Sequence, residues 1–327
     1  MRSRIGALAL ALAALCSFAP PQKPAKGETP RAAPGTTVTV EIPAVSVNVV
    51  VTDPKGNLIT GLSREHFKLF DEGVEQEITN FFPDKSAVSV VLLMESSRII
   101  TSLETDFWDA VDDFARFLRP DDFCALVTFD NRPRIAVDFT QDKNEVVKEA
   151  RSRIFFKGFR DSCLSDAVIF VLDRMKEVQG KKAVVLLSTG LDTFSRATYN
   201  QALERAAAAD TVIYALSMGQ LTRAVNDMRY SDEFRAELNM ADLRLKSFAR
   251  KTGGEAFMPK FVTEYPSIFR IINLLIRHQY TLAFQPTGVK ADGKFHKIRV
   301  EVAADIDNDG KPDKLKAVCR EGYRAPK

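Results

Sequence analysis

Carboxylate and hydroxyl side chains stand where three loops of this chain meet apolar or helical segments. The apolar run Val88–Met94 leads into Glu95-Ser-Ser-Arg98, residues 161–166 (DSCLSD) precede a helical pattern, and residues 188–193 (STGLDT) follow the run AVVLL. In an open α/β sheet the carboxyl ends of the strands meet at one edge, where ligands bind. Oxygen ligands from three such loops could converge on Mg²⁺, which demands near-octahedral coordination. Capping of helix N–H groups is the alternative role for each Ser and Asp.

The elements that must position these loops form a regular cycle from Ser86 to Gln279. Short continuous apolar runs (VVLLM, CALVTF, AVVLLS, TVIYALSM) alternate with helical segments such as 103–118 and 198–209. Continuous runs rich in Val, Ile and Leu are typical of parallel strands buried on both faces. We therefore predict an α/β fold with a doubly wound, mostly parallel, Rossmann-like sheet.

The patterning typical of β-strands continues on both sides of this α/β segment. Residues 38–85 alternate β-branched and polar side chains around turn sequences at Pro54–Asn57 and Asp71–Gly73, and residues 280–327 show the same pattern. Each flank is too short to close a core by itself. We predict that the two flanks pair into one β-sandwich, with a domain at 86–279 inserted between them.

The first residues have the composition of a targeting segment. Two arginines precede the apolar run Ile5–Cys16, and small residues follow it. This pattern predicts a signal peptide over residues 1–19, too short to span a membrane, and a Pro-rich linker over residues 20–37. Leu15, directly before Cys16, argues against a lipoprotein. The expected location is secreted, periplasmic or in the cell envelope.

Composition excludes several function classes. The chain has 327 residues, 45% of them hydrophobic and 27% charged, with a net charge of +3. The charge falls to +1 without residues 1–19, which contain two arginines and no acidic residue, so no nucleic-acid partner is expected. We predict a protein without enzymatic activity or a small-molecule substrate, because no histidine lies near a nucleophile elbow, a zinc-binding pair or a phosphate loop. The histidines are His66, His278 and His296.

Three segments carry a resemblance to a known family. Residues 49–81 (VVVTDPKGNLITGLSREHFKLFDEGVEQEITNF), the following SVVLLMESS and the closing REGYRAP resemble secreted acidobacterial-type proteins with a von Willebrand factor type A domain. The A domain corresponds to roughly Ser86–Gln279, and with its flanks the resemblance covers nearly all of the chain after the signal peptide. The resemblance implies a module that binds another protein through its carboxyl-edge loops.

The family also implies a metal-ion-dependent adhesion site. Members with a working site have Asp-x-Ser-x-Ser in the first loop, Thr in the second and Asp in the third. Only one of these five residues is unchanged in this chain. The corresponding positions are Glu95, Ser97, Ile99, Ser162 and Thr189.

The substitutions argue against Mg²⁺ at this site. Glu95 carries its carboxylate one methylene further out, Ile99 removes a ligand, and Arg98 adds a positive charge beside the expected cation. We predict a degenerate, metal-free site in which Arg98 pairs with Glu95 or Asp166. Asp192 is the carboxylate that could substitute for the missing ligand.

A second acidic loop lies near the C-terminus. Asp305, Asp307 and Asp309 alternate, Gly310 follows, and Asp313 occupies the ninth position, as in the first part of a calcium loop. The twelfth position lacks the Glu of an EF-hand, and strand patterns flank the loop. A weak calcium site and an acidic turn without an ion are the two alternatives.

The sequence as a whole predicts a secreted, non-enzymatic protein-interaction or adhesion module with an unidentified protein partner. No cofactor is certain: calcium at the Asp305–Asp313 loop is the candidate, and Mg²⁺ is not expected. The alternative function is a structural envelope protein that calcium stabilises at that loop.

Overall fold

The computed structural model describes most of the chain after residue 43. The predicted signal peptide and linker, Ile99 and Asp307 lie outside the described residues. No helix within the described part is long and apolar enough to cross a membrane. The described ranges are 44–83, 86–98, 104–153, 161–220, 231–287, 293–306 and 309–325.

Six strands form the central sheet, in the order β10-β9-β8-β5-β6-β7. Each neighbouring pair is parallel except β6 and β7, which are antiparallel. The predicted doubly wound, mostly parallel sheet is therefore confirmed. The strands are β5 (Val88–Glu95), β6 (Phe123–Phe129), β7 (Pro133–Thr140), β8 (Lys181–Ser188), β9 (Val212–Ser217) and β10 (Ala256–Phe257).

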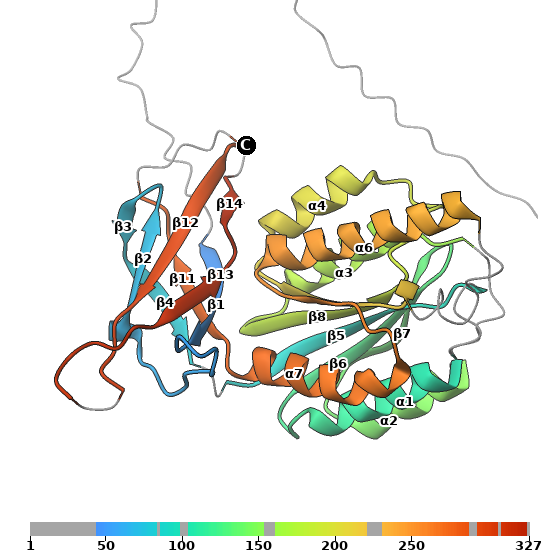
Figure 1. Cartoon of the computed structure of the whole chain (residues 1–327), viewed down its shortest axis with the longest axis horizontal. Coiled ribbons are helices and arrows are strands. Elements are labelled where there is room, and N and C mark those ends of the chain that lie inside the picture. Colours follow the sequence, from blue (N-terminus) through green and yellow to red (C-terminus); the bar gives the residue numbers. More distant parts are fainter. Residues whose placement is uncertain are drawn as a thin grey trace, which may run out of the picture. The chain divides into compact units, whose positions relative to one another are not determined.

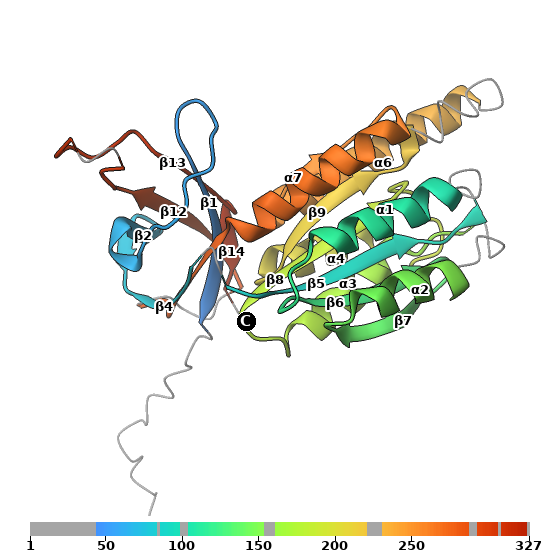
Figure 2. The ribbon, with the colours of Figure 1, turned by 90° about the horizontal axis from the view of Figure 1, so that it is seen from below.

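Helices cover both faces of this sheet (Figure 1). Because side chains alternate along a strand, Val90 and Leu92 of β5 pack in the core with α1, α2 and α7, whereas Val91 and Leu93 pack with α3, α4 and α6. Figure 2 shows α1 and α7 lying side by side on their face of the sheet. The helices are α1 (Glu104–Phe117), α2 (Lys143–Arg153), α3 (Leu164–Met175), α4 (Tyr199–Ala208), α6 (Asp232–Thr252) and α7 (Tyr265–Arg277), with 3-10 turns η1 (Arg64–His66) and η4 (Val262–Glu264).

The two flanking segments pair with each other, as predicted. One antiparallel sheet has the order β13-β1-β11-β4 and the other β14-β12-β2-β3, so each sheet takes two strands from either side of the α/β domain. Their apolar inner faces share one core. The domain boundaries themselves stay predictions. The strands are β1 (Val45–Thr52), β2 (Phe67–Asp71), β3 (Val74–Gln76), β4 (Ile78–Phe82), β11 (Tyr280–Phe284), β12 (Phe295–Val302), β13 (Lys316–Cys319) and β14 (Gly322–Arg324).

An ion pair holds the amino end of the central sheet. Asp122, fully buried, stands before β6 and accepts hydrogen bonds from Val88 N (3.0 Å), Arg119 N (2.8 Å) and Arg277 Nη1 (3.2 Å). Arg277 Nη2 contacts the second carboxylate oxygen. Burial alone would raise the pKa of Asp122, but these hydrogen bonds and the Arg277 charge hold it below its usual value. The pair fixes the end of α7 to the sheet.

Candidate functional site

The ends of β5 and β8 meet at the carboxyl edge of the sheet, around the side chain of Glu95. Met94 lies opposite Leu187, so Glu95 comes next to Ser188. Ser97 Oγ donates to Glu95 Oε1 at 2.5 Å. Glu95 Oε2 accepts from Ser188 Oγ (2.8 Å), Thr189 N (2.8 Å) and Thr189 Oγ1 (2.9 Å). These four donors link the first loop to the third.

The hydrogen-bond network around Glu95 is fully buried. Glu95, Ser97, Ser188 and Thr189 have no exposed surface. A buried carboxylate is tolerated when hydrogen bonds replace its lost hydration, and here three hydroxyls and one amide do so. These side chains therefore form the floor of the site and cannot themselves touch a macromolecular partner.

Ser162 brings the second loop to the same edge. Its amide donates to Thr193 Oγ1 at 3.0 Å, and its carbonyl accepts from Thr193 N (2.8 Å) and Phe194 N (3.0 Å). Its hydroxyl is buried and has no hydrogen-bond partner among the described residues. The main chain thus joins this loop to residues 193–194, and the Ser162 hydroxyl adds nothing to the Glu95 network.

Asp166 and Asp192 join the start of α3 to the third loop. Asp192 Oδ2 accepts from Ser165 N at 3.1 Å, and its Oδ1 accepts from Ser195 Oγ at 2.5 Å. In return, Asp166 accepts from the amides of Arg196 (3.0 Å) and residue 197 (2.9 Å). This is the geometry of helix capping in trans. Asp192 is therefore engaged with α3 rather than with Glu95.

Arg98 is exposed, next to the buried floor. Both oxygens of Glu95 accept from hydroxyl or amide donors, and both oxygens of Asp166 accept from main-chain amides. An ion pair of Arg98 with either carboxylate stays a prediction. The structure shows only that Arg98 is exposed at this edge.

The residues at this edge fit Mg²⁺ poorly. No group of three or more His, Cys, Asp or Glu side chains that could hold a metal occurs in the described part of the chain. Glu95 brings one carboxylate, already bonded to four donors, and Thr189 stands where the family has a second. Octahedral Mg²⁺ needs oxygen ligands at fixed positions, which this arrangement does not supply.

Two further buried acids at this edge were not identified from the sequence. Asp130 directly follows β6 and pairs with Arg134 at 2.6 Å, a position that the strand-end rule could have found. Asp242 of α6 accepts from Ser217 Oγ at 2.5 Å. Asp242 lies four residues after buried Leu238 and therefore on the inward face of the helix. This spacing is the sequence feature that could have identified it.

The exposed rim of the site directly follows the third loop. Phe194 has 54% of its surface exposed, and Arg196 beside it is also exposed. Both line an open groove of about 1220 Å³ between α3 and α4, together with Ile169 and Phe170. This rim offers apolar and cationic surface above the buried floor.

The C-terminal acidic loop is built from turns. Asp305 accepts from the amides of Asp309 (3.1 Å) and Gly310 (2.8 Å). Asp313 Oδ2 accepts from Ile306 N at 2.7 Å. These bonds curl the loop about Asp305, as both an acidic turn and a calcium loop require, so the two alternatives stay open.

No protein-family model and no curated protein matches the chain. Three solved structures illustrate what it is similar to. An aerotolerance-related membrane protein from Bacteroides fragilis is 14% identical, over 58% of this chain and 98% of its own, with a TM-score of 0.45. A von Willebrand factor type A protein from Catenulispora acidiphila is 10% identical, over 87% and 75%, with a TM-score of 0.46. The von Willebrand factor domain of the pilus tip protein Mfa5 from Porphyromonas gingivalis is 12% identical, over 63% and 99%, with a TM-score of 0.42.

Likenesses at these identities and TM-scores say nothing about function. The fold itself is seen directly in the six-stranded sheet with helices on both faces. The solved structures that align with this chain include members of the family that its sequence resembles, the von Willebrand factor type A domain proteins.

Proposed function

We propose that this protein is an exported, non-enzymatic module that binds a protein partner through the carboxyl-edge loops of its α/β domain without a bridging metal. The observation that carries the proposal is the fully buried Glu95 carboxylate, whose oxygens accept from three hydroxyls and one amide. Because these side chains are buried, contact with a partner has to come from the exposed rim.

The rim has the composition of a recognition surface. Exposed Phe194 provides an aromatic side chain that could fill a pocket on a partner, and Arg98 and Arg196 provide cationic donors. Aromatic residues and Arg dominate the binding energy of protein interfaces. The floor beneath them joins the first loop to the third, and the hydrogen bonds of Ser162 with Thr193 and Phe194 join the second. Loops held in this way lower the entropic cost of binding.

The histidines support a non-enzymatic role. Ser63 Oγ and His66 Nδ1 are 2.9 Å apart, but the same nitrogen accepts Ser63 N–H at 3.0 Å, so the contact is part of the cap of η1. His278 is the C-cap of α7, and His296 lies beside Asp71 in the sandwich. None of the three is among the side chains that form the carboxyl-edge site. Export rests on the composition of residues 1–19 alone.

The test is capture of a partner from an envelope extract by the mature protein and by Phe194→Ser. Loss of the same captured protein from Phe194→Ser, with capture by the wild type unchanged in EDTA, is the expected result. Phe123→Ser is the matched control, because Phe123 is 40% exposed but begins β6 at the opposite edge of the sheet. Capture that requires Mg²⁺, or that Phe194→Ser leaves intact, contradicts the proposal.

Calorimetric titration tests directly whether the site binds a divalent metal ion. We expect no saturable heat with Mg²⁺ or Mn²⁺ at micromolar affinity. Micromolar binding abolished by Glu95→Ala would show that Glu95 is a ligand and that the site is metal-dependent.

A further inference from the structure

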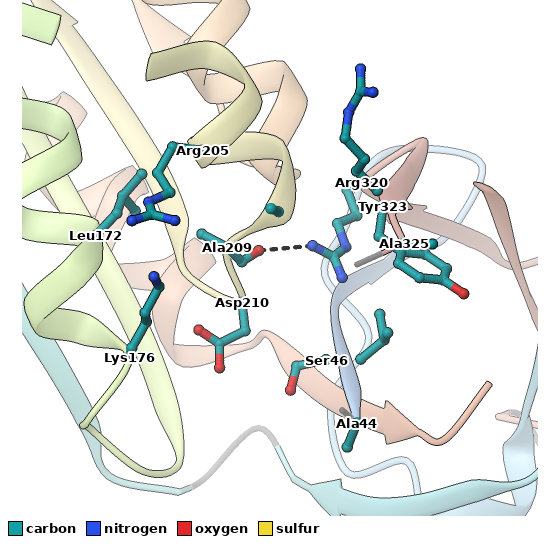
Figure 3. Close-up of a pocket in the computed structure, with 13 residues that line it drawn as sticks. Ala44, Ser46, Leu172, Lys176, Arg205, Ala209, Asp210, Arg320, Tyr323 and Ala325 are labelled. Carbon is teal, nitrogen blue, oxygen red and sulfur yellow. Dashed lines mark hydrogen bonds between the residues drawn. The ribbon is translucent and has the colours of Figure 1, made fainter. Parts of the chain in front are cut away.

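A cavity of about 520 Å³ lies between the α3–α4 side of the α/β domain and strands β1 and β14 of the sandwich (Figure 3). Four of its lining residues are cationic, Lys176, Arg205, Arg320 and Arg324, and one is acidic, Asp210. The remaining lining is mostly aliphatic. A cavity of this size and composition is within the usual range of small-molecule sites.

Arg320 is the residue that distinguishes this cavity. It is 4% exposed, and its Nη1 donates to the carbonyls of Ala209 (2.8 Å) and Ala207 (3.4 Å) at the end of α4. Within the described part of the chain, neither its Nε nor its Nη2 has a hydrogen-bond partner. These two nitrogens form one edge of the guanidinium, the edge that binds carboxylates and phosphates in a bidentate manner.

The acids around the cavity are already engaged with other cations. Lys176 (3.0 Å) and Arg205 (2.6 Å) share the carboxylate of Asp173. Asp210 pairs with Lys182 at 2.5 Å. No carboxylate lies within salt-bridge distance of Arg320 among the described residues, and the charge of Asp210, which pairs with Lys182, acts on it only from further away. Burial lowers the pKa of Arg320 to about 10, which leaves it protonated at neutral pH.

We propose that this cavity binds a small organic oxyanion, a molecule that carries a carboxylate or a phosphate group, with its charged group against the Nε–Nη2 edge of Arg320. Lys176 and Arg205 stand on the other side of the cavity (Figure 3) and add positive potential. Leu172 and Ala209 provide aliphatic wall for the uncharged part of the ligand. The cavity shares Arg205 and Ala208 with the groove beside Phe194, but its ligand class does not depend on the proposed function.

The site lies between the sandwich and the α/β domain, so a bound ligand should change the stability of the chain. Arg320 belongs to the sandwich, whereas Lys176 is the C-cap of α3 and Arg205 belongs to α4. An oxyanion that contacts both sides adds a bond between the sandwich and the α/β domain. The bound ligand therefore raises the melting temperature of the whole chain.

The experiment uses the mature protein with two probes, inorganic phosphate and glucuronate, in buffers matched in ionic strength with chloride. Calorimetry and melting curves should show saturable one-to-one binding of at least one probe. Binding of phosphate identifies the ligand class as phosphorylated, and binding of glucuronate identifies it as carboxylated. No saturable binding of either probe overturns the proposal.

Variants separate this site from a general salt effect. Arg320→Lys keeps the charge at the end of α4 but loses the bidentate edge, and should weaken binding roughly tenfold or more. Lys176→Ser, at an exposed residue, should weaken binding about three- to tenfold, and it decides the matter if Arg320→Lys does not fold. Lys148→Ser is the matched control on α2 and should bind as the wild type does. Equal affinity in the wild type, Arg320→Lys and Lys176→Ser would refute the assignment.

Discussion

The two edges of the central sheet each bury a carboxylate, and they stabilise it in different ways. At the amino edge, Asp122 pairs with the guanidinium of Arg277. At the carboxyl edge, Glu95 accepts from three hydroxyls and one amide. Both acids are fully buried. The comparison is therefore between a charge neutralised by a cation and a charge stabilised by neutral donors.

The difference matches what each edge has to do. A buried ion pair is costly to break, because the remaining partner is left uncompensated, and this suits the edge where α7 is fixed to the sheet. Hydroxyl groups rotate and can exchange donor for acceptor roles. At the carboxyl edge, the hydrogen bonds of Glu95 join the first loop to the third.

The largest expected effect comes from breaking the ion pair. Arg277→Met leaves Asp122 buried with only the amides of Val88 and Arg119 as donors. We expect a loss of about 3–5 kcal/mol in the free energy of unfolding, measured by urea denaturation. Arg174→Met, which breaks an exposed pair with Asp138, is the control and should cost at most about 1 kcal/mol. Similar losses of unfolding free energy in the two variants would mean that the buried pair stabilises the fold no more than an exposed pair does.

The same pair predicts how stability depends on pH. The pKa of Asp122 is below its usual 3.8 in the folded protein, so the ionised form stabilises the fold above the unfolded pKa. That contribution is lost as the pH falls toward the lower, folded pKa. Unfolding free energies measured between about pH 6 and pH 3 should fall less steeply in Asp122→Asn than in the wild type. Equal slopes of unfolding free energy against pH in the two proteins would mean that groups other than Asp122 cause the loss of stability in acid.

A smaller effect is expected at the carboxyl edge. Glu95→Gln keeps an acceptor for Ser188 and Thr189, and the hydroxyl of Ser97 can rotate to accept from the new amide. We expect a loss of about 1–2 kcal/mol in unfolding free energy, less than for Arg277→Met. A loss as large as that of Arg277→Met would show that the hydroxyl network cannot adapt, and the contrast between the edges would then disappear.

The loop after Thr189 gives an intermediate test of rigidity at this edge. Gly190 has a φ of +78°, and a Cβ there would lie 2.5 Å from the main-chain oxygen of Ala241. Gly190→Ala should therefore cost about 1–3 kcal/mol, from backbone strain and displacement of α6. Gly56→Ala is the control, because Gly56 also has a positive φ but has open space around it. Equal losses in melting temperature for the two variants would mean that the positive φ, and not the contact with Ala241, destabilises Gly190→Ala.

The sequence was sufficient for the fold but missed one strand and half of a helix. The edge strand β7 was not predicted, although its apolar residues Ile135, Val137 and Phe139 alternate with polar or small ones as in a strand. Of these three only Val137 is buried, while Ile135 is 39% exposed. The first half of α6 was also missed, although Ser231 accepts from Phe234 N as its N-cap. Both signals are short-range and present in the sequence, so a closer examination of alternation and capping would have found them.

The site could be predicted only in outline. The strand-end rule placed Glu95, Ser162 and Thr189 at one edge, and the structure brings their loops there. The partners of Glu95 depend on the register between β5 and β8, since Ser188 is 93 residues away in sequence. Composition and spacing cannot supply that register. The burial of these side chains follows from the same tertiary packing, so it could not be predicted from composition and spacing either.

The smallest effect is expected at the exposed acidic loop, where main-chain amides donate to the carboxylates of Asp305 and Asp313. The bonds from Asp305 to the amides of Asp309 and Gly310 already shape the loop, so calcium would bind with little rearrangement. Extracellular calcium sites bind at about 10⁻⁴–10⁻³ M, so 1 mM calcium should stabilise the fold by roughly 1 kcal/mol, seen as a small rise in melting temperature. Asp307→Ala should abolish the rise. An unchanged melting temperature at millimolar calcium, or the same rise with magnesium, would leave the acidic turn without an ion as the correct interpretation.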